Sequence, residues 1–316
     1  MADTHLIGLD WGTTQLRAYR FGGDGEVAES RALPAGILRA GADGATGFER
    51  AFEDACGDWR RAAPASAIIA CGMIGSAQGW REAAYVDIPT DFDALGRALT
   101  QVHTERGAVL HIIPGLIARG PLPEVMRGEE TQVAGALASG VAPAGGETWI
   151  GLPGTHAKWV CLRDGRIIQF HTFMTGEIFA VLCAHTILGR TMQRAAPDLG
   201  AFDRGVAVAR SRHARAGVLS TIFSTRTLGL TGALSPEAQA DYLSGLLIGH
   251  EIAGLEAVLD AARPPIVLVG GAELCERYGR ALVAFGHAPP AFAAGATERG
   301  LWRIAHAAGM VSEVPC

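Results

Sequence analysis

Short apolar runs and longer stretches with helical spacing alternate along most of this chain. The β-branched and aliphatic runs predict strands over residues 66–71, 108–113 and 265–269. The spacing of apolar residues predicts helices over residues 47–61, 94–104, 129–138, 176–188, 236–262 and 273–285. Strands that alternate with helices in this way are typical of the α/β class.

One pattern occurs twice: a strand, a Gly-Thr turn, a second strand and a glycine-containing turn. The copies lie over residues 6–25 and residues 149–166. Each copy predicts a β-hairpin that leads into a third strand. A chance pair of glycine hairpins would give the same pattern. Because one copy opens the chain and the other lies near its middle, we favour two similarly built halves.

The length of 316 residues suits two domains of roughly 150 residues each. The Ala-Pro-Ala-Gly-Gly run at residues 142–146 is the best candidate for a boundary between them. The sequence therefore predicts an N-terminal domain over residues 1–146 and a C-terminal domain over residues 147–316.

The composition argues against several classes of protein. A formal net charge of −5 does not suit a nucleic-acid partner. The chain has neither an apolar run of about 18 residues nor a secretory signal, so we expect no membrane association and a cytoplasmic location. The six cysteines never form a Cys-x-x-Cys pair, which predicts reduced thiols instead of a metal or redox site.

Lys158 is the single lysine among 27 basic residues, and the chain has no asparagine. A codon bias explains the scarcity of both residue types. Under such a bias arginine is the default cation, so a remaining lysine indicates a site that needs a compact ammonium group. Chance survival of one lysine is the alternative, and the neighbouring residues have to decide.

The turn of the first hairpin has the sequence of a phosphate-binding loop. Glycine at Gly12 lets the backbone approach a phosphate, and the amides and hydroxyls of Thr13 and Thr14 can donate hydrogen bonds to its oxygens. Asp10, at the end of the preceding strand, is placed to hold Mg²⁺ through water. A plain hairpin would also explain the turn taken alone.

The turn of the second hairpin contains Gly154, Thr155 and His156, and Lys158 follows it. Two such loops that face each other across a cleft would form a phosphoryl-transfer site, and the pair is more specific than either loop. Pro153 stands where the first loop has its aspartate, so only the first loop offers a metal ligand. We expect Lys158 or His156 to compensate charge instead.

Gly270 and Gly271 end an apolar strand and precede a predicted helix. Glycines at this point would let an adenosine group lie against the backbone near a helix N-terminus, although an ordinary strand-to-helix turn needs them too. Neither a Walker A sequence nor a Gly-x-Gly-x-x-Gly fingerprint is present.

Glu129 and Glu130 open the predicted helix over residues 129–138. A carboxylate there could accept the proton of an attacking hydroxyl, or could simply complement the helix dipole. We favour Glu129 as the base and keep Glu130 as a near-equal alternative.

Further candidates are polar residues that could contact an acidic sugar. Arg81 and Arg127 could bind a carboxylate through the guanidinium fork, or could form surface ion pairs. Ser76 and Trp80 lie in a glycine-rich loop after a strand, and Thr175 could line a cleft or cap a helix.

Specific blocks of sequence connect these motifs, the clearest being Met-Arg-Gly-Glu-Glu-Thr-Gln and Pro-Gly-Thr-His-Ala-Lys-Trp. The blocks cover residues 7–17, 72–80, 113–116, 126–132, 153–160, 174–177 and 243–249. In this order they resemble the 2-dehydro-3-deoxygalactonokinase family of the sugar kinase/heat-shock/actin ATPase superfamily.

The resemblance implies two ribonuclease-H-like (actin-like ATPase) domains with an interdomain active-site cleft, and a final helix near residues 298–308 that returns to the interdomain region. It also implies that ATP and Mg²⁺ are used to phosphorylate the C6 hydroxyl of 2-dehydro-3-deoxy-D-galactonate, in galactonate breakdown. Arg17, at the end of the first block, is then expected beside the ATP phosphates, with substrate contacts in the first domain and nucleotide contacts in the second.

The same sequence features are also compatible with other functions. They are a kinase for another sugar or sugar acid, and a non-kinase ATPase or phosphatase of the same fold. The expected partners are a small-molecule sugar acid and ATP. A homodimer is an option that the sequence does not decide.

Overall fold

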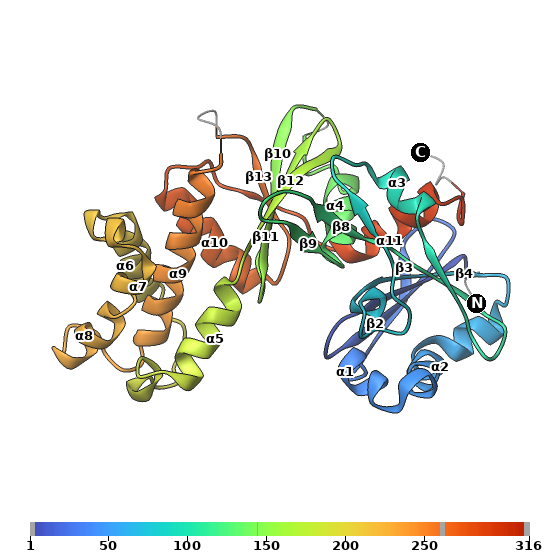
Figure 1. Ribbon diagram of the computed structural model, residues 1–316, viewed down its shortest axis with the longest axis horizontal. Helices are drawn as coiled ribbons and strands as arrows, with labels where there is room; N and C mark the ends of the chain where they lie inside the picture. Colours follow the sequence, from blue (N-terminus) through green and yellow to red (C-terminus); the bar gives the residue numbers. More distant parts are fainter. Residues whose placement is uncertain (1–3, 144, 260–262, 313–316) are drawn as a thin grey trace. The chain divides into compact units, whose positions relative to one another are not determined.

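The computed structural model describes residues 4–143, 145–259 and 263–312 (Figure 1). The chain divides into two compact units. The first comprises Met1–Gly146, Val160–Phe170 and Ala293–Cys316, and the second comprises Glu147–Trp159 and His171–Phe292. One division point falls after residue 146, where the composition changes. Residues 160–170 and 293–316 group with the first unit, so the units are not two continuous stretches of chain.

The first unit is built on a six-stranded sheet in the order β3-β2-β1-β4-β7-β6. The strands are β1 (Leu6–Trp11), β2 (Leu16–Phe21), β3 (Val27–Leu33), β4 (Ala67–Gly72), β6 (Thr100–His103) and β7 (Val109–Ile112). Strand β1 pairs antiparallel with β2 and parallel with β4, and β4 pairs parallel with β7. The carboxyl ends of β1 and β4 therefore meet at one edge of the sheet.

Helices cover both faces of this sheet, which explains why β1 is almost completely buried. On one face, Phe48 and Phe52 of α2 (Gly44–Ala62) pack in a core cluster with Ile7 and Leu9 of β1. Gly8 points to the other face, because successive side chains of a strand alternate. There it contacts Leu301 of α11 (Ala296–Ala307), whose side chain would lie 2.9 Å from a Cβ at Gly8.

Helix α4 (Glu129–Ala138) follows a small sheet and packs closely on α11. That sheet has the order β5-β8-β9, formed by β5 (Tyr85–Asp87), β8 (Gly115–Ala118) and β9 (Glu124–Met126). A Cβ at Gly135 would lie 1.7 Å from the carbonyl oxygen of Ala296, so the two helices touch through backbone. This contact fixes the start of α4 relative to the large sheet.

A second sheet has five strands in the order β12-β11-β10-β13-β14. Residues 160–170 of β11 and β12 group with the first unit, and the rest of this sheet groups with the second. Its strands are β10 (Glu147–Leu152), β11 (Ala157–Arg163), β12 (Arg166–Phe173), β13 (Ile266–Leu268) and β14 (Ala291–Phe292). The order β12-β11-β10-β13 repeats the order β3-β2-β1-β4, and β10 pairs parallel with β13 as β1 does with β4. The predicted repeat of two hairpins with a third strand is confirmed.

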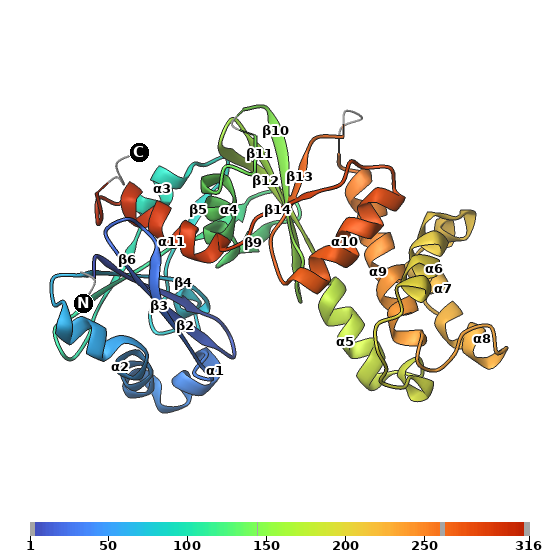
Figure 2. The same ribbon diagram turned by 180° about the vertical axis from the view of Figure 1, so that it is seen from behind.

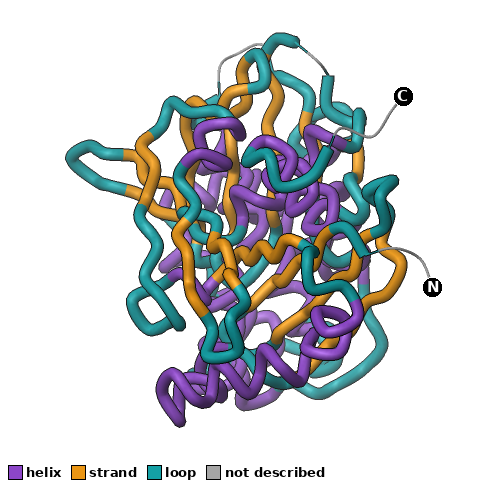
Figure 3. The backbone as a smooth tube through the Cα atoms, turned by 90° about the vertical axis from the view of Figure 1, so that its right-hand side faces the viewer, coloured by secondary structure: helices purple, strands orange, loops and turns teal. Residues whose placement is uncertain are grey.

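The helices of the second unit gather on one side of its sheet (Figures 1 and 2). They include α5 (Thr175–His185), α6 (Leu199–Arg210), α7 (Val218–Thr221), α8 (Ser224–Leu230), α9 (Gln239–Glu256) and α10 (Ala272–Ala284). Helices α6 and α9 pack through Gly205 and Gly245, where a Cβ would lie 2.1 Å and 1.9 Å from a backbone oxygen of the other helix. Strands and helices are mixed throughout (Figure 3), which confirms the predicted α/β class.

The predicted helix over residues 94–104 is wrong in its second half. Helix α3 (Phe92–Arg97) ends early, and β6 follows, because Val102 is buried and β6 pairs antiparallel with β7. The predicted helix over 236–262 is shorter in the structure, where α9 spans Gln239–Glu256; residues 260–262 lie outside the described part of the chain. Among the described residues, no helix has the length and apolar character needed to cross a membrane.

Candidate active site

The predicted phosphate loop of the first unit is a tight turn whose carbonyl groups are hydrogen-bonded to the rest of the unit. The amide of Gly12 donates to the carbonyl of Gln15 at 2.9 Å, which closes the turn after β1. The carbonyls of Gly12 and Thr13 accept amides from the start of α1 (Ile37–Ala40) at 3.0 and 3.2 Å. The side chains of Thr13 and Thr14 are exposed. The turn is therefore fixed by its carbonyls and presents its hydroxyls to solvent.

Asp10 lies at the end of β1, directly opposite Arg17 of β2. Its carboxylate pairs with the Arg17 guanidinium at 3.2 Å. Burial raises the pKa of Asp10, and the charge of Arg17 acts in the opposite direction. The described residues contain no group of three or more potential metal-ligating side chains of the His, Cys, Asp or Glu type. One carboxylate is nevertheless enough for Mg²⁺, which takes few protein ligands and keeps several waters.

Two glycines bring the start of α4 to the end of β4. Gly72 is paired with Trp11 and has φ +90°. Gly128 has φ +107°, and a Cβ there would lie 3.2 Å from the Cα of Gly72. Both positive φ values favour glycine. As a result, Glu129 and Glu130 begin their helix beside the carboxyl edge of β1 and β4.

The adjacent glutamates at this helix start have different environments. Glu130 is completely buried, and both of its carboxyl oxygens accept a hydrogen bond from the Gly128 amide, at 2.7 and 2.9 Å. Burial, followed by the charge of Glu129, raises the pKa of Glu130 to about 8. Glu129 is only half-buried, and its Oε2 accepts the Arg127 amide at 3.0 Å. At neutral pH, Glu130 is mainly protonated, while Glu129 is the more accessible acid.

The guanidinium of Arg127 has unused hydrogen-bonding capacity. Its Nη2 donates to the carbonyl of Ala83 at 2.7 Å, and the group lies over the ring of Tyr85, 4.4 Å from the centroid. Its Nε and Nη1 are buried and have no hydrogen-bond partner within the described part of the chain. Buried donors without a partner cost about 1–3 kcal/mol each. A bound anion would remove that cost.

The glycine-rich loop after β4 contains three predicted substrate contacts, Ser76, Trp80 and Arg81. Ser76 is the one that we place near Arg127. Ser76 Oγ is buried without a partner among the described residues, and the neighbouring Gly75 would bring a Cβ within 2.9 Å of Arg127 Nη1. Trp80 instead stacks on Phe48, with 5.9 Å between ring centroids, so core packing accounts for its position. Arg81 is exposed.

In the second unit, the Gly154–His156 turn rests on the start of α5. The carbonyl of Thr155 accepts the Glu177 amide at 3.0 Å, and His156 Nε2 contacts the Glu177 carboxylate. Lys158 lies on β11 and is 5% exposed, and its ammonium donates back to the His156 carbonyl at 3.5 Å. The turn is therefore held by the start of α5, and Lys158 contacts the turn through the His156 carbonyl.

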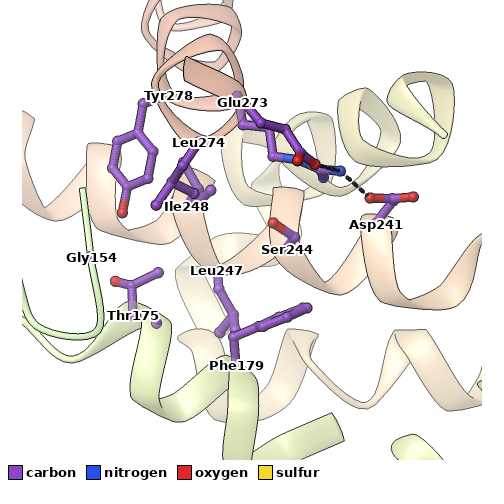
Figure 4. A pocket seen from close by; sticks show the side chains of 12 residues that line it. Gly154, Thr175, Phe179, Asp241, Ser244, Leu247, Ile248, Glu273, Leu274 and Tyr278 are labelled. Carbon is purple, nitrogen blue, oxygen red and sulfur yellow. Dashed lines mark ion pairs between the residues drawn. The ribbon is translucent and has the colours of Figure 1, made fainter. Parts of the chain in front are cut away.

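A pocket of about 240 Å³ lies beside this turn, among α5, α9 and α10 (Figure 4). Its walls are largely apolar, and Asp241 and Arg277 form an ion pair of 2.6 Å at its edge. The lining residues are Gly154, Thr175, Gly176, Phe179, Asp241, Ser244, Leu247, Ile248, Glu273, Leu274, Arg277 and Tyr278. Such a pocket suits a flat, mostly apolar group with a polar edge.

Gly270 and Gly271 form the turn from β13 into α10, which supplies part of the pocket wall. Gly271 caps the helix, and a Cβ at Gly270 would lie 3.5 Å from the Pro153 carbonyl oxygen. Thr175, the first residue of α5, also lines the pocket. The polar lining from α9 and α10 was missed in the sequence, because single residues on two long helices show no local motif.

The chain matches the 2-keto-3-deoxy-galactonokinase family over residues 10–304. It is 35% identical to the 2-dehydro-3-deoxygalactonokinase of Escherichia coli over 303 residues, which covers 95% of this chain and 97% of that protein. A crystal structure of a Sinorhizobium meliloti protein, described as a candidate 2-dehydro-3-deoxygalactonokinase, is 33% identical. It covers 96% of this chain and 99% of that one, with a TM-score of 0.83.

A more distant structure shows the fold alone. The activator of 2-hydroxyisocaproyl-CoA dehydratase from Clostridium difficile, with bound ADPNP, has a TM-score of 0.50 at 14% identity, and the match covers 99% of this chain and 100% of that one. The predicted ribonuclease-H-like, actin-like ATPase fold is confirmed. With the family match and these high coverages, the chain belongs to the 2-keto-3-deoxy-galactonokinase family.

Proposed function

We propose that this protein transfers the γ-phosphate of ATP to the C6 hydroxyl of 2-dehydro-3-deoxy-D-galactonate, giving 2-dehydro-3-deoxy-6-phosphogalactonate. The observation that carries the proposal is the 35% identity to the Escherichia coli 2-dehydro-3-deoxygalactonokinase over 95% of the chain. We place the reaction in the cytoplasm, since it needs ATP and the described cysteines are free thiols.

The sugar acid needs a group that binds its carboxylate, and we assign this role to Arg127. Its two unpartnered buried nitrogens can satisfy a carboxylate through charge-assisted hydrogen bonds. The ring of Tyr85 and the carbonyl of Ala83 already orient the guanidinium. Ser76 Oγ, which also has no partner within the described residues, supplies a further hydrogen bond.

The acceptor hydroxyl needs a base, and we assign this role to Glu129. The neighbouring Glu130 is too deeply buried to reach a substrate, and its oxygens are occupied by the Gly128 amide. Glu130 then has a positioning role, because it holds the backbone from which the Glu129 side chain extends. A positioned base contributes about 10²- to 10⁴-fold in rate.

Both predicted loops are proposed as phosphate-binding elements, each in its own unit. Adenosine occupies the pocket of the second unit, with Thr175 at the wall. Gly270 and Gly271 do not line this pocket, and they precede α10, which does. Each turn is a phosphate-binding candidate within its own unit: the turn at 12–14 offers amides and hydroxyls with Arg17 nearby, and the turn at 154–156 offers them with Lys158 nearby. Asp10 is the carboxylate that would hold Mg²⁺, which neutralises phosphate charge when bound.

The direct test is ADP release by the purified protein with ATP and Mg²⁺, with and without 2-dehydro-3-deoxy-D-galactonate. We expect release that depends on this acid and is weaker with its gluconate-derived epimer. Equal rates with the two acids would widen the acceptor range of the kinase. ADP release that ignores the acceptor would contradict the proposal and favour a non-kinase ATPase.

Substitution Arg127→Met should lower kcat/KM for the sugar acid by about 10- to 100-fold, because charged hydrogen bonds to the carboxylate are lost. The dissociation constant for ADP should stay within about twofold of the parent, within the usual error of such additivity arguments. Arg81→Met is the matched control, since Arg81 is exposed, and should change kcat/KM little. A larger effect at Arg81 than at Arg127 would reassign the carboxylate contact.

Substitution Glu129→Gln should reduce acceptor-dependent turnover by about 100-fold or more, since the amide cannot accept the proton. Steady-state kinetics at saturating ATP and sugar acid would measure this. Glu130→Gln should retain more turnover than Glu129→Gln. If the order of the two variants were reversed, Glu130 would be the base.

Glu130→Gln should also change how the stability of the protein depends on pH. The pKa of Glu130 is raised from 4.5 to about 8 on folding, so its neutral form stabilises the fold fully below pH 4.5, and this contribution is lost as the pH rises to about 8. The urea midpoint of Glu130→Gln should therefore fall less between these pH values than that of the parent protein.

A further inference from the structure

Glu251 is a buried carboxylate in the second unit that the site described above does not use. It lies on α9 and is 3% exposed. Its Oε1 accepts the indole N–H of Trp159 at 2.7 Å, and its Oε2 accepts the hydroxyl of Tyr278 at 2.7 Å. The side chain of Thr175 also lowers the pKa of the Glu251 carboxyl group. The carboxylate thus accepts hydrogen bonds from β11 and α10, and it is influenced by the first residue of α5.

Two of these residues, Thr175 and Tyr278, come from helices that line the proposed nucleotide pocket. Tyr278 and Thr175 themselves line the pocket (Figure 4). Glu251 is not one of the lining residues, and it contacts the pocket wall through the Tyr278 hydroxyl. Tyr278 also packs on Trp159, with 6.2 Å between ring centroids. Since rotation of any one donor would leave a buried polar group unsatisfied, the carboxylate holds the wall of the pocket in one arrangement.

The network also reaches the phosphate turn. Thr175 is the first residue of α5, and the Glu177 amide of the same helix turn holds the carbonyl of Thr155. Gly176 packs so closely that a Cβ there would lie 2.4 Å from the Gly154 carbonyl oxygen. Any shift of Thr175 would move this turn as well.

Burial of Glu251 is unfavourable in itself. Burial raises the pKa of its carboxyl group, and the side chains of Thr175, Tyr278 and Trp159 lower it. An apolar side chain would fill the same space without the desolvation cost. An acid at this position instead orients its hydrogen-bond donors, because its two oxygens accept the indole N–H of Trp159 and the hydroxyl of Tyr278.

We propose that Glu251 is a positioning residue for nucleotide binding, which sets the pocket wall and the Gly154–Thr155 turn without touching the nucleotide. The inference rests on the proposed use of this pocket by adenosine. It assigns to a buried acid on α9 a function in nucleotide affinity.

The test is the dissociation constant for ADP, measured by titration calorimetry without acceptor, for the parent protein and Glu251→Gln. The amide has one acceptor oxygen where the carboxylate has two, so at least one donor loses its partner. We expect ADP binding about tenfold weaker, as one unsatisfied buried donor predicts. Tyr278→Phe removes one of the donors and should weaken binding less.

Glu256→Gln is the matched control, because it makes the same change on the same helix, where the carboxylate pairs with Arg263 at 3.0 Å away from the pocket. Its ADP affinity should equal that of the parent. Thermal unfolding of each variant identifies a temperature at which it is fully folded, and binding is compared there. A residue with a purely structural role would change the melting temperature and leave the affinity unchanged.

ADP binding to folded Glu251→Gln within about twofold of the parent, the usual additivity error, would overturn the inference. If that variant does not fold, unchanged binding by Tyr278→Phe would overturn it equally. Failure of the proposed function has a different signature. In that case the parent protein binds ADP, but its ADP release does not depend on the sugar acid.

Discussion

The backbone contact between Gly72 and Gly128 determines where the acidic groups of the first unit meet. Strands β1 and β4 run parallel, so their ends share one edge of the sheet. The start of α4 lies close to that edge because Gly128 has no side chain, whereas a side chain at Gly72 would meet the Trp11 carbonyl. The Cα of Gly72 would lie 3.2 Å from a Cβ at Gly128. The position of Glu129 depends on this contact. The buried carboxyl group of Glu130 also holds Gly128 in place, because its oxygens accept the Gly128 amide.

Each of the two units contains buried polar groups that cost free energy. A fully buried Glu130, unpartnered nitrogens on Arg127 and an acid at Glu251 all lower stability relative to apolar replacements. The aromatic and aliphatic core under the sheet offsets these costs, because each large apolar side chain buried there contributes about 1.5–3 kcal/mol. Residues that lower the stability of the fold in this way are expected at functional sites.

Much of the scaffold follows from local pattern. The repeated hairpins, the helix bounds of 129–138 and the placement of Asp10 opposite Arg17 all follow from short-range periodicity and turn residues. The sequence could not show that Trp80 packs on Phe48, or that residues 100–103 form a strand, because both depend on partners distant in the chain. The same limit hid the proposed nucleotide pocket and the hydrogen bonds of Glu251, which come from β11 and α10.

If the contact between Gly72 and Gly128 positions Glu129 for catalysis, substitution Gly128→Ala should disturb that position. Gly107→Ala is the matched control, since Gly107 also has a positive φ of +76° but no atom within 4 Å of a Cβ. We predict that Gly128→Ala lowers acceptor-dependent ADP release by about 30-fold or more, within the range of a lost base, with ADP affinity unchanged and with Gly107→Ala fully active. Turnover of folded Gly128→Ala equal to that of Gly107→Ala would show that this contact does not position Glu129.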